Sequence, residues 1–514
     1  MAASGGDSRA RSPENRHTGP QSGPQPILPP RERKAPSLQR RLAILGIGIV
    51  VLVLVFGARI PESIRTVHGA TLAPPGQHAL AVLAFALVLW IGEALPFHMT
   101  GFIAMGLLAL VNVQGWSELV KTGFGDEATV FFIGVLALAS ALGRSGLAAR
   151  LGRLVLRFAG GSTRALVFWF LVAGAFLAMW VTALAAAALM LPLARGILRD
   201  EGDEPGSKFG AALMLAVAFG PLVGACGAPS GSGSNPVALR FLADIAQFHI
   251  SYLDWMRIGI PVVIALLPLA WAAILLLFPP ERRRLRSPGT NLLAAGSQKA
   301  TPLSRDEKAT GIVFLLVVAC WLGAPWLEKL VSVKISLALV AALGAAALFL
   351  PGLTSFRWKE LEKDMDWAGI LLIATGIALG TALYKSGAAA WAASLVLGGI
   401  GSLSPFWRIA AVVVGVLVVK VVFSSNTLTG TIIVPLILAL GVTLGIDARL
   451  PALAAAFTAN LAVILVTTSP VNVLPWSTGY FSIADMARTG LVFALPAALA
   501  LAAIFSLLGP RLLG

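Results

Sequence analysis

The chain has 514 residues, of which 57% are apolar and 12% are charged, and its mean hydropathy is +0.85. Soluble globular domains carry about 25% charged residues, so this composition leaves too little polar surface to coat a water-exposed body. Apolar runs of about 20 residues recur, the length that a helix needs to cross ~30 Å of hydrocarbon. The sequence thus predicts an integral membrane protein and excludes a single-anchor enzyme. The missing ten-residue alternation excludes an outer-membrane barrel.

The net charge of +15 does not predict a nucleic-acid partner, because the basic residues gather beside apolar runs. One group precedes Leu42, and another, at 282–286, follows the run that ends at Phe278. Basic residues in these places are typical of cytoplasmic loops, where they also contact anionic lipids. We therefore expect a multi-pass protein of the inner membrane with a cytoplasmic N-terminus.

The apolar runs give the order of elements along the chain. Spans are predicted near 42–57, 78–96, 100–114, 127–143, 254–278, 309–327, 335–351, 367–385 and 485–508. Four further apolar stretches, 165–198, 208–246, 406–441 and 451–480, are interrupted by Gly, Pro, Ser, Thr or Asn. The first run lacks a small-residue cleavage site and is interpreted as a retained span rather than a signal peptide.

The chain repeats itself on either side of its longest polar connection. Three short segments match in the same order: 141–146 with 382–387, 190–193 with 433–436, and 252–259 with 483–490. Counting spans from a cytoplasmic N-terminus places the two halves in opposite orientations, an arrangement typical of secondary transporters. The predicted organisation is a disordered basic cytoplasmic tail (1–40), a first span and connection (41–74), a first inverted repeat (75–278), a cytoplasmic loop (279–308) and a second inverted repeat (309–514).

Residues 423–431 place hydroxyls and an amide in the middle of an apolar stretch, which predicts two short helices that meet at a tip, a re-entrant hairpin. Such a tip offers neutral oxygens and N–H donors, and a half-helix N-terminus favours an anion. The alternative interpretation is a polar cluster that holds helices together. Lys420, shortly before the tip, either attracts an anion or extends its ammonium to the membrane interface.

A second polar interruption, 467–472, contains a proline that breaks a helix and exposes carbonyls suited to a hard cation such as Na⁺. Its counterpart in the first half is 227–236. A simple transmembrane kink is the alternative. The predicted fold is therefore all-α and polytopic, with about 11 transmembrane helices in two inverted repeats, two re-entrant hairpins and two broken helices.

These motifs resemble the divalent anion/sodium symporter family, which includes dicarboxylate, citrate and sulfate transporters. The resemblance rests on Ser425-Asn426-Thr427, on the Pro/Asn break, and on segments 93–96, 385–387 and 477–480. It implies a homodimer that works as an elevator, with Ser425, Asn426 and Thr427 contacting Na⁺ and a substrate carboxylate. The residues expected to bind substrate are Ser425, Asn426, Thr427, Thr182, Asn235, Asn472 and Thr468. Those expected to bind Na⁺ are Ser425, Asn426, Thr467, Pro470, Asn472, Gly227 and Ser234.

The first hairpin departs from the family pattern, which carries Ser-Asn-Thr at both tips. Aligning Pro192 with Pro435 places 182–184, Thr-Ala-Leu, opposite 425–427. This tip keeps one hydroxyl and lacks the amide, although the serines of 230–235 compensate in part.

The sequence predicts a non-enzymatic transporter that moves a small anion, a di- or tricarboxylate or sulfate, coupled to Na⁺. A sodium-independent exchanger or uniporter, a Na⁺/H⁺ antiporter and a metalloid exporter remain alternatives. The antiporter is disfavoured because no acid falls within a hairpin or a break. Arg144 and Lys385, at equivalent positions near span ends, are expected to anchor at the membrane interface.

Overall fold

A computed structural model describes residues 37–286 and 302–513. Residues 1–36 of the predicted cytoplasmic tail and residues 287–301 of the predicted cytoplasmic loop lie outside the described residues. The description below concerns the unit from Ala35 onward.

The first half begins with a long helix and a small two-stranded antiparallel sheet, and continues as helices. Its elements are α1 (Leu38–Gly57), α2 (Glu62–Arg65), β1 (Thr66–Val67), β2 (Ala70–Thr71), α3 (Pro74–Gly92), α4 (Phe97–Leu110), α5 (Trp116–Phe124), α6 (Glu127–Ser145), α7 (Leu147–Leu156), η1 (Arg157–Ala159), α8 (Thr163–Trp180), α9 (Ala183–Glu201), α10 (Lys208–Gly224), η2 (Pro229–Gly231), α11 (Ser234–Ala246) and α12 (Tyr252–Leu277).

In the described part of the second half, every regular element is a helix. Its elements are α14 (Arg305–Val331), α15 (Leu337–Ala347), α16 (Trp358–Leu361), η3 (Glu362–Asp364), α17 (Trp367–Lys385), α18 (Ala388–Leu397), η4 (Gly398–Ser402), α19 (Pro405–Val422), α20 (Asn426–Leu444), α21 (Arg449–Ala459), η5 (Val466–Thr468), α22 (Pro470–Trp476), α23 (Ile483–Leu507) and α24 (Gly509–Leu513).

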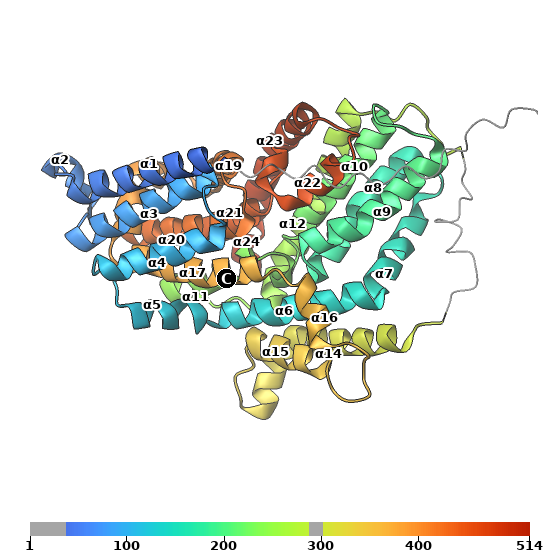
Figure 1. Cartoon of the computed structure of the whole chain (residues 1–514), viewed down its shortest axis with the longest axis horizontal. Helices are drawn as coiled ribbons and strands as arrows, with labels where there is room; N and C mark the ends of the chain where they lie inside the picture. Colours follow the sequence, from blue (N-terminus) through green and yellow to red (C-terminus); the bar gives the residue numbers. More distant parts are fainter. Residues whose placement is uncertain (1–36, 287–301, 514) are drawn as a thin grey trace, which may run out of the picture. The chain divides into compact units, whose positions relative to one another are not determined.

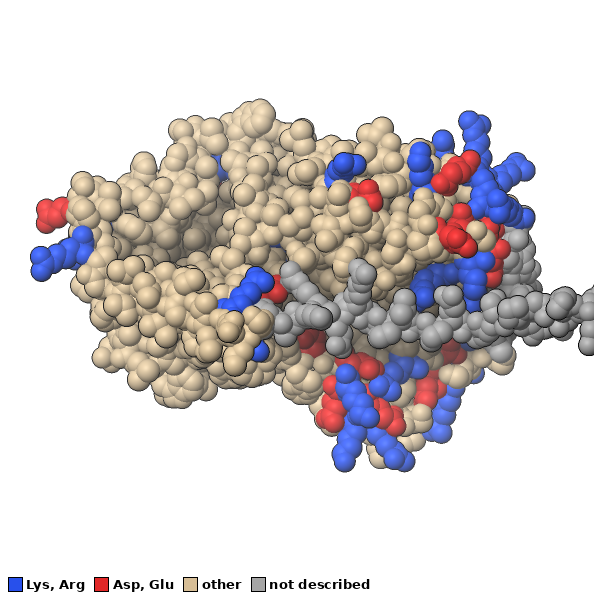
Figure 2. All heavy atoms as spheres, turned by 45° about the horizontal axis from the view of Figure 1, so that its top comes forward, with Lys and Arg blue, Asp and Glu red and all other residues tan. Residues whose placement is uncertain are grey.

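Ten helices in the described residues are long and apolar enough to cross a membrane. The face drawn in Figure 2 is largely free of charged side chains, which gather in a few groups. The prediction of an all-α polytopic membrane protein is confirmed. Two of the predicted spans, 100–114 and 335–351, form shorter helices, α4 and α15, of 14 and 11 residues.

The second predicted span ends earlier than the sequence analysis placed it. Helix α3 stops at Gly92, and Glu93 adopts a left-handed conformation with φ of +51°. The physical reason is Pro96, since the residue before a proline is disfavoured in the helical conformation and the chain has to turn before it. Glu93 therefore lies in a connection and not within the span.

Each predicted hairpin is a pair of helices, α8 with α9 and α19 with α20, and each predicted broken helix has two arms, α10 with α11 and α21 with α22. Helices α8, α9 and α10 run side by side in Figure 1. The arms interlock between the halves: α11 packs on α20 and α21, whereas α22 packs on α9 and α10. The second arm of each broken helix is thus held by the opposite half.

Two ion pairs also join the halves in a reciprocal way. Arg144, at the end of α6, pairs with Asp364 just before α17, with Nη2 and Oδ1 3.1 Å apart. Lys385, at the end of α17, pairs with Glu118 in α5, with Nζ and Oε1 2.8 Å apart. The two basic residues therefore serve as inter-half contacts, which the sequence analysis did not predict.

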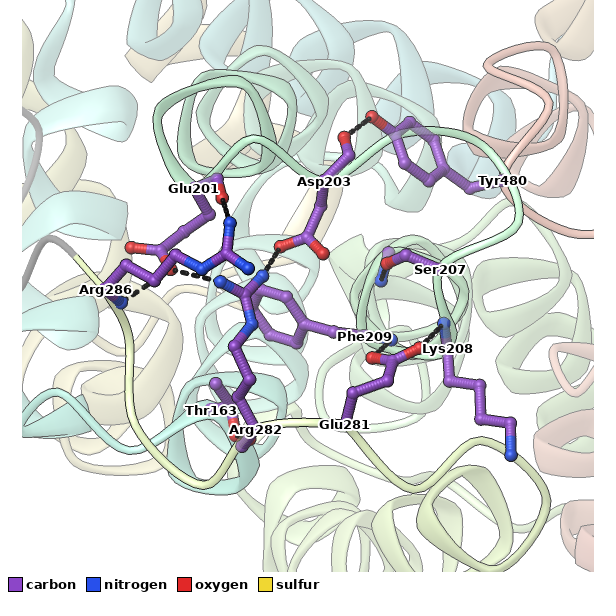
Figure 3. A network of polar contacts seen from close by, with 11 residues as sticks. Thr163, Glu201, Asp203, Ser207, Lys208, Phe209, Glu281, Arg282, Arg286 and Tyr480 are labelled. Carbon is purple, nitrogen blue, oxygen red and sulfur yellow. Dashed lines mark hydrogen bonds and ion pairs between the residues drawn. The ribbon is translucent and has the colours of Figure 1, made fainter.

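A polar network lies where α9 ends and α10 begins (Figure 3). The carboxylate of Glu201 is buried and accepts a 2.7 Å hydrogen bond from the backbone N–H of Arg286. Arg282 contacts both Glu201 and Asp203, and the hydroxyl of Tyr480 donates to the carbonyl of Asp203 at 2.8 Å. The network ties the end of the first hairpin to the segments that follow α12 and α22.

Candidate functional site

The second hairpin tip is built around the N-terminus of α20. Ser425 is the N-cap, and its hydroxyl accepts a hydrogen bond from the backbone N–H of Leu428 at 3.2 Å. The cap satisfies one of the N–H groups that a helix start leaves without a partner. Asn426 and Thr427 follow as the first residues of the helix and are half-buried. The tip thus presents a hydroxyl, an amide and a helix N-terminus together.

The first hairpin tip has the same backbone design but fewer polar groups. Thr182 is the N-cap of α9, and its hydroxyl accepts from the backbone N–H of Ala185 at 3.3 Å. Pro192 and Pro435 lie at the same distance along α9 and α20, which supports the sequence alignment of the tips. Ala183 and Leu184 add no polar side chain, so the first tip lacks the amide that Asn426 provides.

Both helix breaks are closed by one asparagine in the same manner. In the first break the amide of Asn235 donates to the carbonyls of Ala225 and Ala228 at 2.8 and 2.9 Å, ten and seven positions earlier. Asn472 donates to the carbonyls ten and seven positions before it, those of Ala462 and Leu465, at 2.6 and 3.2 Å. We call this arrangement the asparagine clamp. It supplies side-chain donors to buried carbonyls at the breaks, where the regular hydrogen bonds of a helix are interrupted in an apolar environment.

The first break is linked to the opposite half by a buried amide. Asn460, which follows α21, donates from Nδ2 to Oδ1 of Asn235 at 2.9 Å and accepts at Oδ1 from the hydroxyl of Ser234 at 2.8 Å. All three side chains are completely buried. A Cβ added at Gly233 would lie 2.5 Å from Oγ1 of Thr427, so the second tip touches the first break.

The first hairpin contacts its break through neutral groups, and we call this contact the first junction (Met179, Gly227 and Ser230). The Ser230 hydroxyl donates to the Met179 carbonyl at 2.7 Å and accepts from the Tyr252 hydroxyl at 2.9 Å. Gly227 allows close packing here, because an added Cβ would lie 2.8 Å from the side chain of Met179, which would have to move.

The second hairpin contacts its break through a charge, and we call this contact the second junction (Lys420, Phe423 and Thr468). The ammonium of Lys420 donates to the carbonyls of Phe423 and Thr468 at 3.3 and 3.2 Å. Lys420 is 2% exposed, so, of the two alternatives that the sequence left open for it, extension to the membrane interface is wrong. The Thr468 hydroxyl donates to the carbonyl of Leu465 at 2.7 Å and so holds the break against the ammonium.

Two amide oxygens near these contacts have no hydrogen-bond donor among the described residues. They are Oδ1 of Asn426 at the second tip and Oδ1 of Asn472 in the second clamp, and both are buried. Buried acceptors are normally paired, so oxygens of this kind fit a ligand that brings a cation or a donor. Neutral carbonyl and amide oxygens are suitable ligands for a hard cation. The residues present therefore fit Na⁺.

The predicted residues divide into two groups. The tip, the clamps and Ser234 lie in the buried contacts described above, whereas Pro470 is exposed at the start of α22 and Thr467 is half-buried. The structure therefore does not bring the Pro470 side chain into the buried network. Gly227 provides close packing against Met179.

Sequence reasoning missed three residues of these contacts: Asn460, Tyr252 and Glu93. Asn460 had a usable signal, since it is an amide within the apolar stretch 451–466. Glu93 accepts a 3.3 Å hydrogen bond from Ser424 beside the second tip, a contact between residues more than three hundred positions apart. Neither that pairing nor the one between Tyr252 and Ser230 has a local sequence signature.

Comparison of the sequence with known proteins gives a match to one family model. The sequence model described as "Sodium:sulfate symporter transmembrane region" matches residues 42–513. The sodium-dependent dicarboxylate transporter SdcS of Staphylococcus saprophyticus is 28% identical over 459 residues, which cover 86% of this chain and 88% of that protein. SdcS of Staphylococcus aureus strain USA300 is 27% identical over 439 residues, 82% of this chain and 84% of the relative.

Among solved structures, the fold is similar to that of Neisseria gonorrhoeae MtrF, whose structure is titled as illuminating a class of antimetabolite efflux pumps. The TM-score is 0.53 at 12% sequence identity, over 90% of this chain and 94% of that chain. At this level of identity the likeness concerns the fold alone.

Proposed function

The chain belongs to the sodium:sulfate symporter family, and from this premise we propose that it is a secondary transporter that couples Na⁺ to the movement of a small anion. The proposed anion is a di- or tricarboxylate or sulfate. The relatives named as sodium-dependent dicarboxylate transporters favour a dicarboxylate.

The observation that supports this proposal most is the contact of the second tip with the first break. Thr427 lies against Gly233, and next to it Ser234, Asn235 and Asn460 form a fully buried polar network. Polar groups at membrane depth are costly and persist where they face a bundle interior or a cavity. Hydroxyl and amide donors bind carboxylate oxygens, and free amide oxygens bind the cation that travels with them.

The interlocked arms favour a mechanism in which both hairpins and both broken helices move as one body. We propose that this body carries anion and cation across the membrane as an elevator within a homodimer, in the inner membrane, with the N-terminus in the cytoplasm. The two halves form inverted repeats in this proposal, which places the two tips on opposite sides of the bound anion.

Uptake into proteoliposomes tests the proposed function. The purified chain is reconstituted, and radiolabelled succinate, citrate or sulfate is supplied outside with either NaCl or KCl. We expect uptake of at least one anion that requires an inward Na⁺ gradient and that is lost in Asn426→Ala. Absence of uptake of every anion in both salts would contradict the proposal.

Sodium-independent exchange is the second candidate function, because the first tip lacks the amide of the second. Counterflow distinguishes the two: vesicles are loaded with unlabelled succinate in KCl and labelled succinate is added outside. Accumulation without Na⁺ at the rate seen with Na⁺ would assign the chain to this second candidate.

A further inference from the structure

We propose that the ammonium of Lys420 is a tethered cation that takes the place of a mobile ion at the second junction. The inference rests on the proposed function, since it names how one of the two junctions obtains its positive charge. Any coupling Na⁺ then uses oxygens other than the carbonyls of Phe423 and Thr468.

The ammonium lies where a cation is favoured electrostatically. Lys420 is in the last turn of α19, and its two partners are the carbonyl of the C-cap Phe423 and the carbonyl of Thr468 at the end of η5. The C-terminus of a helix carries partial negative charge on carbonyls that have no intrahelical donor. Carbonyls from a hairpin and a break that converge in this way are the ligands expected for a hard cation, and here an ammonium uses them.

The burial of this charge has no compensating acid. No Asp or Glu of the described residues forms an ion pair with Lys420, and the side chain is 2% exposed. Removing an ammonium from water costs several kcal/mol, which two neutral carbonyls offset only in part. An ionisable residue at membrane depth without a partner acid is typical of a functional site rather than of a structural contact.

The first half lacks this charge. The residue at the corresponding place before the first tip is Leu177, which is 3% exposed. The hairpin–break contact there is made by the hydroxyl of Ser230. The first junction is therefore neutral, whereas the second junction carries the ammonium of Lys420.

The test compares the response to Na⁺ of the full chain and of Lys420→Met, which keeps the unbranched stem and removes the charge. Thermal unfolding of each purified protein is followed in NaCl and in choline chloride at equal ionic strength, without any anion substrate. We expect Na⁺ to stabilise Lys420→Met more than the unmodified chain, because vacated carbonyls become available to the ion. Val416→Ala, on the same buried face of α19, controls for loss of packing and is expected to respond as the unmodified chain does.

Uptake provides the second readout. The Hill coefficient for Na⁺ in anion uptake should rise by about one in Lys420→Met, whereas it should be unchanged in Val416→Ala. Equal Na⁺ responses of Lys420→Met and the unmodified chain in both assays would overturn the proposal. If the unmodified chain transports no anion, the proposed function fails, but the unfolding comparison still tests the role of Lys420.

Failure of Lys420→Met to fold also has a defined meaning. Recovery of folded protein only in Na⁺ would support the proposal, since the ion then replaces the ammonium. If no salt restores it, Lys420→Arg decides the matter. Folding of that variant with the Na⁺ response of the unmodified chain supports a tethered cation, and loss of either property overturns it.

Discussion

The two halves use the same asparagine clamp but different junctions. Asn235 and Asn472 pair carbonyls at identical spacings, whereas the contact between hairpin and break is a hydroxyl, Ser230, in the first half and an ammonium, Lys420, in the second. The backbone carbonyls of any broken helix require hydrogen-bond donors in an apolar environment, and both halves supply them with the clamp. The junctions determine the charge beside each break, and here the two halves differ: the first junction is neutral and the second is positively charged.

The largest expected effect concerns the tips. Asn426→Ala and Thr427→Ala should each reduce anion uptake by at least about tenfold, since each removes a polar group that contacts the proposed substrate or cation. Thr443→Ala is the control, because it removes the same hydroxyl and methyl groups at the far end of α20, where the Thr443 hydroxyl donates to the carbonyl of Ala439. Unchanged uptake in both tip variants, correctly inserted, would remove the second tip from the site.

The contributions of the two clamps to the stability of the fold can be compared by replacing each asparagine with alanine. Asn235→Ala and Asn472→Ala each remove two buried hydrogen bonds to backbone carbonyls, each worth about 0.5–1.5 kcal/mol. Asn235→Ala should lower the melting temperature more, because Asn460 also loses its hydrogen bond to Oδ1 of Asn235. Thermal unfolding in detergent measures both. Equal melting temperatures for Asn472→Ala and the unmodified chain would show that the clamp does not hold the break.

Substitutions at the neutral first junction should reduce the free energy of unfolding less than substitutions of the clamp asparagines. Ser230→Ala and Tyr252→Phe remove the two ends of one 2.9 Å hydrogen bond, and each is expected to cost about 1 kcal/mol. In a double-mutant cycle the combined effect should be smaller than the sum. Strict additivity would mean that the two hydroxyls act independently.

The smallest effect is expected at an exposed inter-half ion pair. The hydrogen bond from Lys385 lowers the pKa of Glu118 below its usual 4.5. A carboxyl with a lowered pKa stabilises the fold above its unfolded pKa, and this contribution is lost as pH falls through the lowered value. Lys385→Met should therefore lower the melting temperature slightly at pH 7 and low salt, and not at all near pH 3. An equal loss at both pH values would exclude this pair as its cause.

Much of the fold was predictable because the length and apolarity of membrane helices identify them in the sequence. The tip and break motifs were visible for a related reason, since polar residues within apolar stretches stand out. The cross-half partners of these motifs were not predictable. Asn460 meets Asn235, and Glu93 meets Ser424, through packing between segments hundreds of residues apart. The burial of Lys420 was not predictable for the same reason. The sequence around a lysine near a helix end is the same whether its ammonium extends to the membrane interface or is buried in the protein.

The central claim is that the contact of the second tip with the first break belongs to a site that binds a small anion together with Na⁺. It is tested most directly by thermal unfolding of the unmodified chain with succinate, citrate, malate, sulfate or phosphate, in NaCl and again in KCl. A ligand at 100 times its dissociation constant adds ~2.7 kcal/mol to the free energy of unfolding. The account predicts stabilisation by at least one of these anions, larger in NaCl than in KCl. Stabilisation by none of them in either salt would contradict it.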